Sequence, residues 1–123
     1  MLRSCFLEIS SYLGQICMVG EDKMYGLIGK IIAVSGCRDE LIGILLDATG
    51  DMPGCLSYVI ARDAADENAI WVTEVWDSQV SHAASLSLPA VQQAVALGRS
   101  LIAGFGERIV TDPVGGHSGP LKR

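Results

Sequence analysis

The alternation of apolar and polar residues is clearest between Ala69 and Asp77, in the segment AIWVTEVWD. Side chains of a strand point alternately to its two faces. One face would carry Ile70, Val72, Glu74 and Trp76, and the other Trp71, Thr73 and Val75. Large apolar groups on both faces predict a strand that is covered on two sides. Glu74 is the exception, a carboxylate on a face that should be buried, and we expect a site at this strand.

The remaining pattern predicts three more strands and three helices. Strands are expected at 25–34, 55–62 and 106–111, with Leu56, Tyr58 and Ile60 facing one way. Helices are expected from about residue 39 to Gly50, over 78–85, and from Pro89 to a stop at Gly104. Gly26 and Gly29 inside the first strand indicate close approach of another backbone.

This order is β-α-β-β-α-β, which predicts an α+β protein of ferredoxin-like fold with an antiparallel sheet and helices on one face. The helices can cover only one face of the sheet, yet the strands are apolar on both. A second copy of the sheet is the simplest cover for the other face, so we expect a homodimer.

The two ends of the chain are less defined by the pattern. Residues 1–23 form an N-terminal extension in which apolar residues recur at helical spacing, as in an amphipathic helix. A signal peptide, or a true start at Met24, are alternatives, and as a helix the extension would dock on the domain or be disordered. Residues 115–123 are rich in Gly and Pro and are expected to be a flexible tail.

Composition narrows the class of protein. The chain has 123 residues, half of them hydrophobic, which fits one domain. Its net charge of −5 and pI near 4.8 disfavour nucleic-acid and anionic membrane partners. Four widely spaced cysteines without a histidine cluster predict free thiols in a cytoplasmic protein and no metal site. No apolar run is long enough to cross a bilayer.

Two motifs carry a family resemblance. Met52 to Tyr58 (MPGCLSY) is similar to a "P-G-C-x-x-Y" strand entry, and Glu74 to Ser78 (EVWDS) is similar to an "E-x-W-x-S" segment, followed by the helix with Pro89. In this order, residues 24–114 resemble the antibiotic biosynthesis monooxygenase family, which includes quinol monooxygenases. The resemblance implies a dimeric α/β barrel built from two ferredoxin-like domains.

The chain also departs from the family pattern. Ser85 and Ala90 stand where many members carry histidines, so no histidine role is carried over. The haem-degrading relatives use an asparagine on the first strand, which residues 25–34 lack, and Leu86 stands at their helix histidine. Haem degradation is therefore disfavoured.

The resemblance implies a cofactor-independent monooxygenase that oxidises a phenolic, quinol or polyketide-like aromatic with O2, without metal or flavin. His82 or Glu74 would be the catalytic base, and Trp76 and Tyr58 would bind the substrate. Asn68, in the loop before the strand, is a further substrate-binding candidate, with a turn role as the simpler interpretation.

Each of these residues also has a plainer interpretation. Trp76 and Tyr58 could fill the core, Glu74 could pair with Arg62 or Arg99, and His82 could be a solvated helix residue. Two other functions stay open on this scaffold: a non-oxidative isomerase or decarboxylase, and a non-catalytic small-ligand-binding domain. An arginine in the cavity would favour a polar or phosphorylated substrate.

Overall fold

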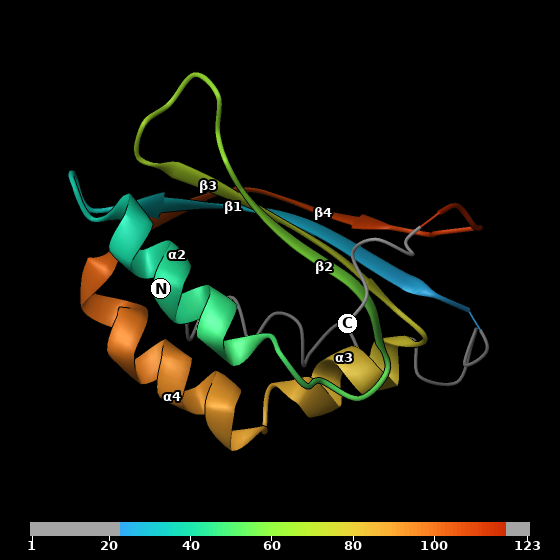
Figure 1. Cartoon of the computed structure of the whole chain (residues 1–123). Coiled ribbons are helices and arrows are strands. Elements are labelled where there is room, and N and C mark those ends of the chain that lie inside the picture. Colours follow the sequence, from blue (N-terminus) through green and yellow to red (C-terminus); the bar gives the residue numbers. More distant parts are fainter. Residues whose placement is uncertain (1–22, 118–123) are drawn as a thin grey trace.

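The computed structural model describes residues 23–117 and shows a four-stranded antiparallel sheet with three α-helices on one side of it (Figure 1). The elements in chain order are β1 (Tyr25–Ala33), α2 (Arg38–Ala48), β2 (Cys55–Arg62), β3 (Ala69–Trp76), α3 (Gln79–Ser85), α4 (Pro89–Gly98), a 3₁₀ turn (Arg99–Leu101) and β4 (Ile102–Thr111). The strand order is β2-β3-β1-β4. The predicted α+β, ferredoxin-like fold is confirmed.

The predicted domain 24–114 lies within the described residues. The predicted amphipathic helix of the N-terminal extension lies outside them, and so does the tail beyond residue 117. Within residues 23–117, no helix combines the length and the apolar character that a membrane crossing requires.

The faces predicted for β3 are confirmed by burial. Ile70, Val72 and Trp76 are buried on the helix side, while Thr73 is exposed. The central pairing runs from Tyr25 opposite Trp76 to Ile32 opposite Ala69, and β4 pairs with the other edge of β1. The helix-side residues Leu27, Gly29 and Ile31 of β1 therefore each have a partner on both flanking strands.

The buried core is split into two clusters along β1. Tyr25, Leu27 and Trp76 form one cluster, and Ala33, Leu41, Ile70 and Val72 form the other. Gly29 occupies the helix-side position between them, opposite Val72 on β3. Because glycine has no side chain, the core is interrupted at this point, and the gap is where a cavity lies.

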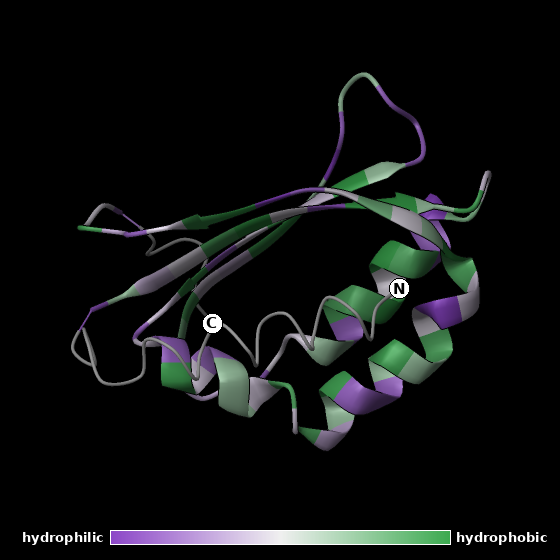
Figure 2. Ribbon diagram, turned by 180° about the vertical axis from the view of Figure 1, so that it is seen from behind, coloured by the Kyte–Doolittle hydropathy of each residue, from purple (hydrophilic) through white to green (hydrophobic). Residues whose placement is uncertain are grey.

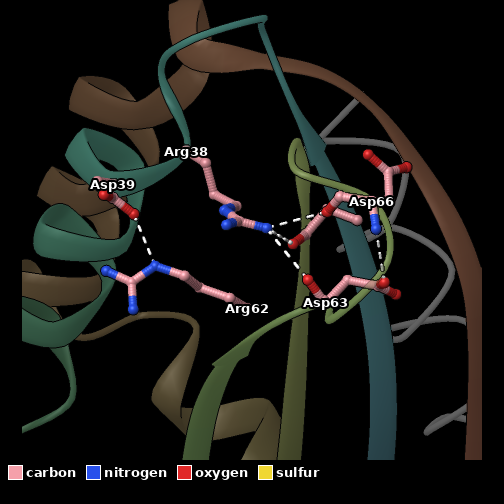
Figure 3. A network of polar contacts seen from close by, with 6 residues as sticks. Arg38, Asp39, Arg62, Asp63 and Asp66 are labelled. Atoms are coloured by element: carbon pink, nitrogen blue, oxygen red, sulfur yellow. Dashed lines mark hydrogen bonds and ion pairs between the residues drawn. The ribbon is translucent and has the colours of Figure 1, made fainter.

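The first turn of α2 is tied to the loop between β2 and β3 (Figure 3). Arg38 Nη1 donates to the carbonyl oxygens of Asp63, Asp66 and Ala69, at 3.3, 2.9 and 3.3 Å. The Asp63 carboxylate accepts the Asp66 backbone N–H and the Trp71 indole N–H. These hydrogen bonds, the backbone ones first, lower the pKa of Asp63 to about 2. The network fixes the loop that leads into β3.

Three details of the sequence prediction are wrong. The helix begun by Pro89 ends at Gly98, and Ile102 and Gly104 belong to β4, where Ile102 lies opposite Ala33. Because the register shifts between Cys55 and Ser57, it is Cys55 and not Leu56 that lies opposite Trp76, at the helix-side position. Gly29 does not mark a close approach, because a Cβ built there has no atom within 4 Å.

The outer face of the sheet is also apolar. Hydrophobic stretches run along the strands in Figure 2. The register places Ile28, Val59, Trp71, Val75 and Ile109 on the side away from the helices. No helix of the described part of the chain lies on this side (Figure 1).

Candidate active site

A cavity of about 520 Å³ lies between the sheet and the helices. Its size is in the range of pockets that bind small molecules. Most of its lining is apolar, and the groups with distinct chemistry include Tyr58, Glu74, Trp76, His82 and Arg108, with the Lys30–Glu107 pair also at its border. The helices α2 and α4 contribute apolar side chains and Thr49 but no titratable group. The cavity therefore combines an apolar wall with a few polar groups from the strands and α3.

The entry to β2 positions α3 beneath the sheet. Gly54 has φ +85°, a conformation that glycine adopts without strain. A Cβ there would lie 2.5 Å from Ser81 Cβ, so the turn packs directly on α3. Ser78 caps α3 by accepting a hydrogen bond from the Ser81 N–H at 3.1 Å. This packing places His82, one turn into the helix, against the end of β3.

Glu74 is the acid of the site. Its Oε1 accepts a hydrogen bond from the Trp76 indole N–H at 2.9 Å, and its side chain is only 12% exposed. Burial raises the pKa of Glu74 to about 7, against the lowering effects of the Trp76 hydrogen bond and the Arg108 charge. The alternative in which Glu74 pairs with Arg62 is not found, because Arg62 Nε donates to Asp39 Oδ1 at 2.9 Å (Figure 3). Neither Arg62 nor Arg99 lines the cavity.

His82 is buried rather than solvated. It is 3% exposed, with its ring 5.2 Å from that of Tyr25 and 5.4 Å from that of Trp76. Burial, helped by the Arg108 charge, lowers the pKa of His82 to about 4, so the imidazole is neutral at neutral pH. Its Nε2 lies 3.7 Å from Glu74 Oε1, too far for a hydrogen bond. The interpretation of His82 as a solvated helix residue is therefore wrong.

Trp76 and Tyr58 both line the cavity. Trp76 is 1% exposed and belongs to the core as well, so its two interpretations are not exclusive. Tyr58 lies opposite Glu74 on the neighbouring strand. Burial, followed by the charge of Glu74, raises the pKa of Tyr58 well above its usual value. Tyr58 therefore stays a neutral phenol that can donate a hydrogen bond.

Asn68 is not brought to the cavity. Its backbone N–H donates to Asp66 Oδ1 at 2.9 Å, and its carbonyl oxygen accepts from the Ala33 N–H at 2.7 Å. Asn68 is not among the residues that line the cavity. These contacts agree with the turn role, and the substrate-binding assignment has no support in this position.

Arg108 is a site residue that the sequence prediction missed. It lies on β4 opposite Gly29, on the helix side of the sheet. Its Nε and Nη2 are shielded from solvent, and neither has a hydrogen-bond partner. The signal was present in the strand GERIVT, where Arg108 alternates with Ile109 as Glu74 does with its neighbours. The face could be assigned only once the register with β1 was known.

The described residues do not offer a metal site. Between residues 23 and 117, no group of three His, Cys, Asp or Glu side chains lies close enough together to hold an ion. Cys55 is a free thiol near Glu74, and burial raises its pKa. The chemistry of the cavity thus rests on Glu74, His82, Tyr58 and Arg108.

The fold and the cavity define the class: a ferredoxin-like α+β domain that encloses an apolar pocket with an acid, an imidazole and an aromatic wall. Residues 24–97, more than half of the chain, match the family described as antibiotic biosynthesis monooxygenase. The chain belongs to this family.

Solved structures agree with this assignment. A protein of Chloroflexus aurantiacus J-10-fl, named for the antibiotic biosynthesis monooxygenases, is 63% identical, with a TM-score of 0.75 over 76% of this chain and 96% of that one. A Pseudomonas aeruginosa protein is 16% identical, with a TM-score of 0.68 over 79% and 100%. A Deinococcus radiodurans protein with the same family name is 23% identical, with a TM-score of 0.63 over 76% and 95%. The last two show the fold alone. No curated protein matches the sequence.

Proposed function

We propose that the protein is a cofactor-independent monooxygenase that oxidises a phenolic, quinol or polyketide-like aromatic with O2. The observation that carries this proposal is the Glu74 carboxyl, held at a pKa of about 7 inside an apolar cavity lined by Trp76 and Tyr58. A base with a pKa near the working pH is suited to removing the proton of a phenol. The apolar wall is suited to holding the ring.

In the proposed reaction, Glu74 takes the phenolic proton and the resulting electron-rich anion reduces O2 directly. With a dihydroxynaphthalene, one oxygen atom of O2 ends on a ring carbon, giving a hydroxynaphthoquinone. The other oxygen leaves as water with two hydrogens of the substrate. The substrate supplies all four electrons, so the balance needs no metal, flavin or external reductant. The cavity would exclude bulk water from the oxygenated intermediate.

Glu74 and His82 have different parts in this proposal. An imidazole with a pKa of about 4 is almost never protonated at neutral pH, so it is a weak base for a phenol. We assign the base to Glu74. His82, packed between Tyr25 and Trp76, would hold the indole in place and complete the wall.

We also propose that two copies associate through the outer face of the sheet. Ile28, Val59, Trp71 and Val75 lie on this face and are half-buried or more exposed within a single chain. A contiguous apolar surface of this kind is a typical protein–protein interface. Two sheets packed face to face would form the dimeric α/β barrel.

A second candidate function is favoured by Arg108. An arginine in the cavity suits the carboxylate of a keto acid, which the scaffold could isomerise or decarboxylate without O2. The two candidates differ in their need for oxygen. A conversion that proceeds equally well under nitrogen would select the second candidate.

The direct test is O2 uptake by the purified full chain with a panel of dihydroxynaphthalenes and anthrones. We expect uptake with at least one of them, and a drop of about a hundredfold or more in the Glu74→Gln variant. Glu67→Gln is the matched control, because Glu67 is exposed in the loop before β3. Lack of uptake with every compound, or equal uptake by the Glu74→Gln variant, would contradict the proposal.

A further inference from the structure

Arg108 is a partly buried cation without an ion-pair partner among the described residues. Nε and Nη2 are shielded from solvent without a hydrogen-bond partner, and within residues 23–117 the guanidinium has no carboxylate within ion-pair distance. Buried donors are nearly always paired in folded proteins, and an unpaired charge is costly. A donor pair that the protein leaves open beside a cavity points to a ligand oxygen.

The backbone register separates Arg108 from Glu74. Arg108 lies opposite Gly29 on one side of β1, and Glu74 lies opposite Leu27 on the other. Two strand spacings and an offset of two residues put their Cα atoms about 12 Å apart. Gly29 leaves the intervening surface open, since nothing lies within 4 Å of a Cβ built there. The cavity that Glu74 and Arg108 both line therefore has room for an aromatic ring beside Gly29.

The other titratable groups that line the cavity form no ion pair with Arg108. The pKa of His82 is about 4 and that of Glu74 about 7, so at neutral pH the imidazole is neutral and the carboxyl is half protonated. Tyr58 is a neutral phenol. Lys30 and Glu107, which also border the cavity, lie 4.0 Å apart and balance each other. The charge of Arg108 lowers the pKa of Glu74, but that carboxyl is only half ionised at neutral pH, so the cavity keeps a net positive charge from Arg108.

We propose that Arg108 binds the ionised oxygen of the aromatic substrate through Nε and Nη2, so that the cavity selects phenols in their anionic form. The inference rests on the proposed function, because it names the charge state of that substrate. Guanidinium donors form strong, directional hydrogen bonds to anionic oxygens. Such donors, themselves shielded from solvent, would stabilise the phenolate from which electrons pass to O2.

The test uses 4-nitrophenol, whose phenolate absorbs visible light while the phenol does not. Its absorbance is titrated against pH, free and bound to the full-length protein, without O2 consumption as a readout. We expect the protein to bind the phenolate on the order of tenfold or more tighter than the phenol, which appears as a lowered pKa of the bound compound. 4-Nitroanisole has the same ring without an ionisable oxygen, and its affinity should not depend on Arg108.

Two variants and a control locate the effect. Arg108→Gln should abolish the preference for the phenolate, and Arg108→Lys should keep part of it, because it keeps the charge but not the paired donors. Arg99→Gln, which removes the same charge from an exposed position outside the cavity, should change nothing. The melting temperature of the Arg108→Gln variant should not fall, because the replaced charge has no partner to lose.

Four results would overturn the inference. They are an unshifted pKa of bound nitrophenol in the natural protein, no binding of nitrophenol at all, equal shifts in the Arg108→Gln and Arg99→Gln variants, and binding of inorganic phosphate in place of nitrophenolate. Because nitrophenol binding needs no turnover, its result does not depend on the result of the O2-uptake test. A shifted pKa of bound nitrophenol without O2 uptake would support the anion site at Arg108 and reject the monooxygenase. O2 uptake without a shifted pKa would support the monooxygenase and reject the anion site.

Discussion

The indole N–H of Trp76 donates to Oε1 of Glu74 at 2.9 Å, and both side chains lie on the helix side of β3. The hydrogen bond stabilises the carboxylate and opposes the effect of burial, which nevertheless raises the pKa of Glu74 to about 7. The two residues are separated by one position in sequence, so the strand geometry itself sets their contact. The acid of the site is therefore held by the same residue that forms its aromatic wall.

Replacing Trp76 with Phe should raise the pKa of Glu74 further, because the hydrogen bond that lowers it is lost. The free energy of unfolding should fall by about 1 to 2 kcal/mol from the smaller ring and the lost bond. The carboxyl stretch of Glu74 followed by infrared spectroscopy across pH would show the change. Trp71→Phe is the control: it removes a hydrogen bond to Asp63, away from the cavity, and should leave the Glu74 titration in place.

The pH dependence of stability gives a second test of the Glu74 environment. Its pKa is higher in the folded protein than in the unfolded chain, so the folded state binds more protons between about pH 4.5 and pH 7. Stability from this group is therefore lost as pH rises through that window, by about 3 kcal/mol in total. The pKa of His82 is lowered to about 4, so this residue makes the folded state more stable as pH rises from about 4 to 6.5. Its effect masks the loss of stability that Glu74 causes over the same pH range.

The Glu74→Gln substitution removes the contribution of Glu74 to the pH dependence of stability and leaves that of His82. The stability of this variant relative to the natural protein should rise by about 3 kcal/mol from pH 4.5 to pH 7 and then level off. Urea unfolding at a series of pH values measures the difference. A relative stability that does not change with pH would mean that the folded carboxyl has an ordinary pKa.

Gly29→Leu should fill the cavity without straining the fold. Nothing lies within 4 Å of a Cβ at this position, whereas a Cβ at Gly98 would lie 3.0 Å from Leu41 Cδ1. We expect the Gly29 variant to keep its melting temperature and lose ring binding by tenfold or more, and Gly98→Ala to lower the melting temperature. Thermal melts with and without 4-nitrophenol separate the two effects. Unimpaired ring binding by the Gly29 variant would place the ligand elsewhere.

Val59→Asp tests the proposed dimer. Val59 lies opposite Thr73 on the outer face of the sheet, and an unpaired charge buried there would cost several kcal/mol. We expect dissociation to monomers, followed by light scattering. Val114→Asp, at a side chain that is 91% exposed, is the matched control and should not change the assembly. A Val59 variant that remains dimeric would exclude this face as the interface.

The sequence was sufficient where the structure follows from local alternation. The period of two in β3 assigned both of its faces correctly and singled out Glu74 as the buried acid. The same logic failed at the end of α4, where Val91, Val95 and Ile102 fit a continued helical stripe. There, pairing with β1 decides: Ile102 lies opposite Ala33 and Phe105 opposite Ile31. That pairing joins residues about 70 positions apart in sequence, beyond the reach of a local pattern.

Burial of polar site residues was not predictable for the same reason. His82 has polar neighbours in α3, and the rings that enclose its imidazole come from Tyr25 on β1 and Trp76 on β3. Arg108 belongs to a correctly predicted strand, but its face depends on the register with Gly29. Distant contacts set the burial of both residues, and that burial decides their charge.

The fate of the two oxygen atoms of O2 shows whether the protein is a monooxygenase. The full-length protein is incubated with an oxidisable dihydroxynaphthalene under O2 of the heavy oxygen isotope, and the product and water are analysed by mass spectrometry. We expect a hydroxynaphthoquinone that carries one heavy oxygen atom, with the other in water, and loss of both signals in the Glu74→Gln variant. A converted substrate without heavy oxygen would contradict the proposed function.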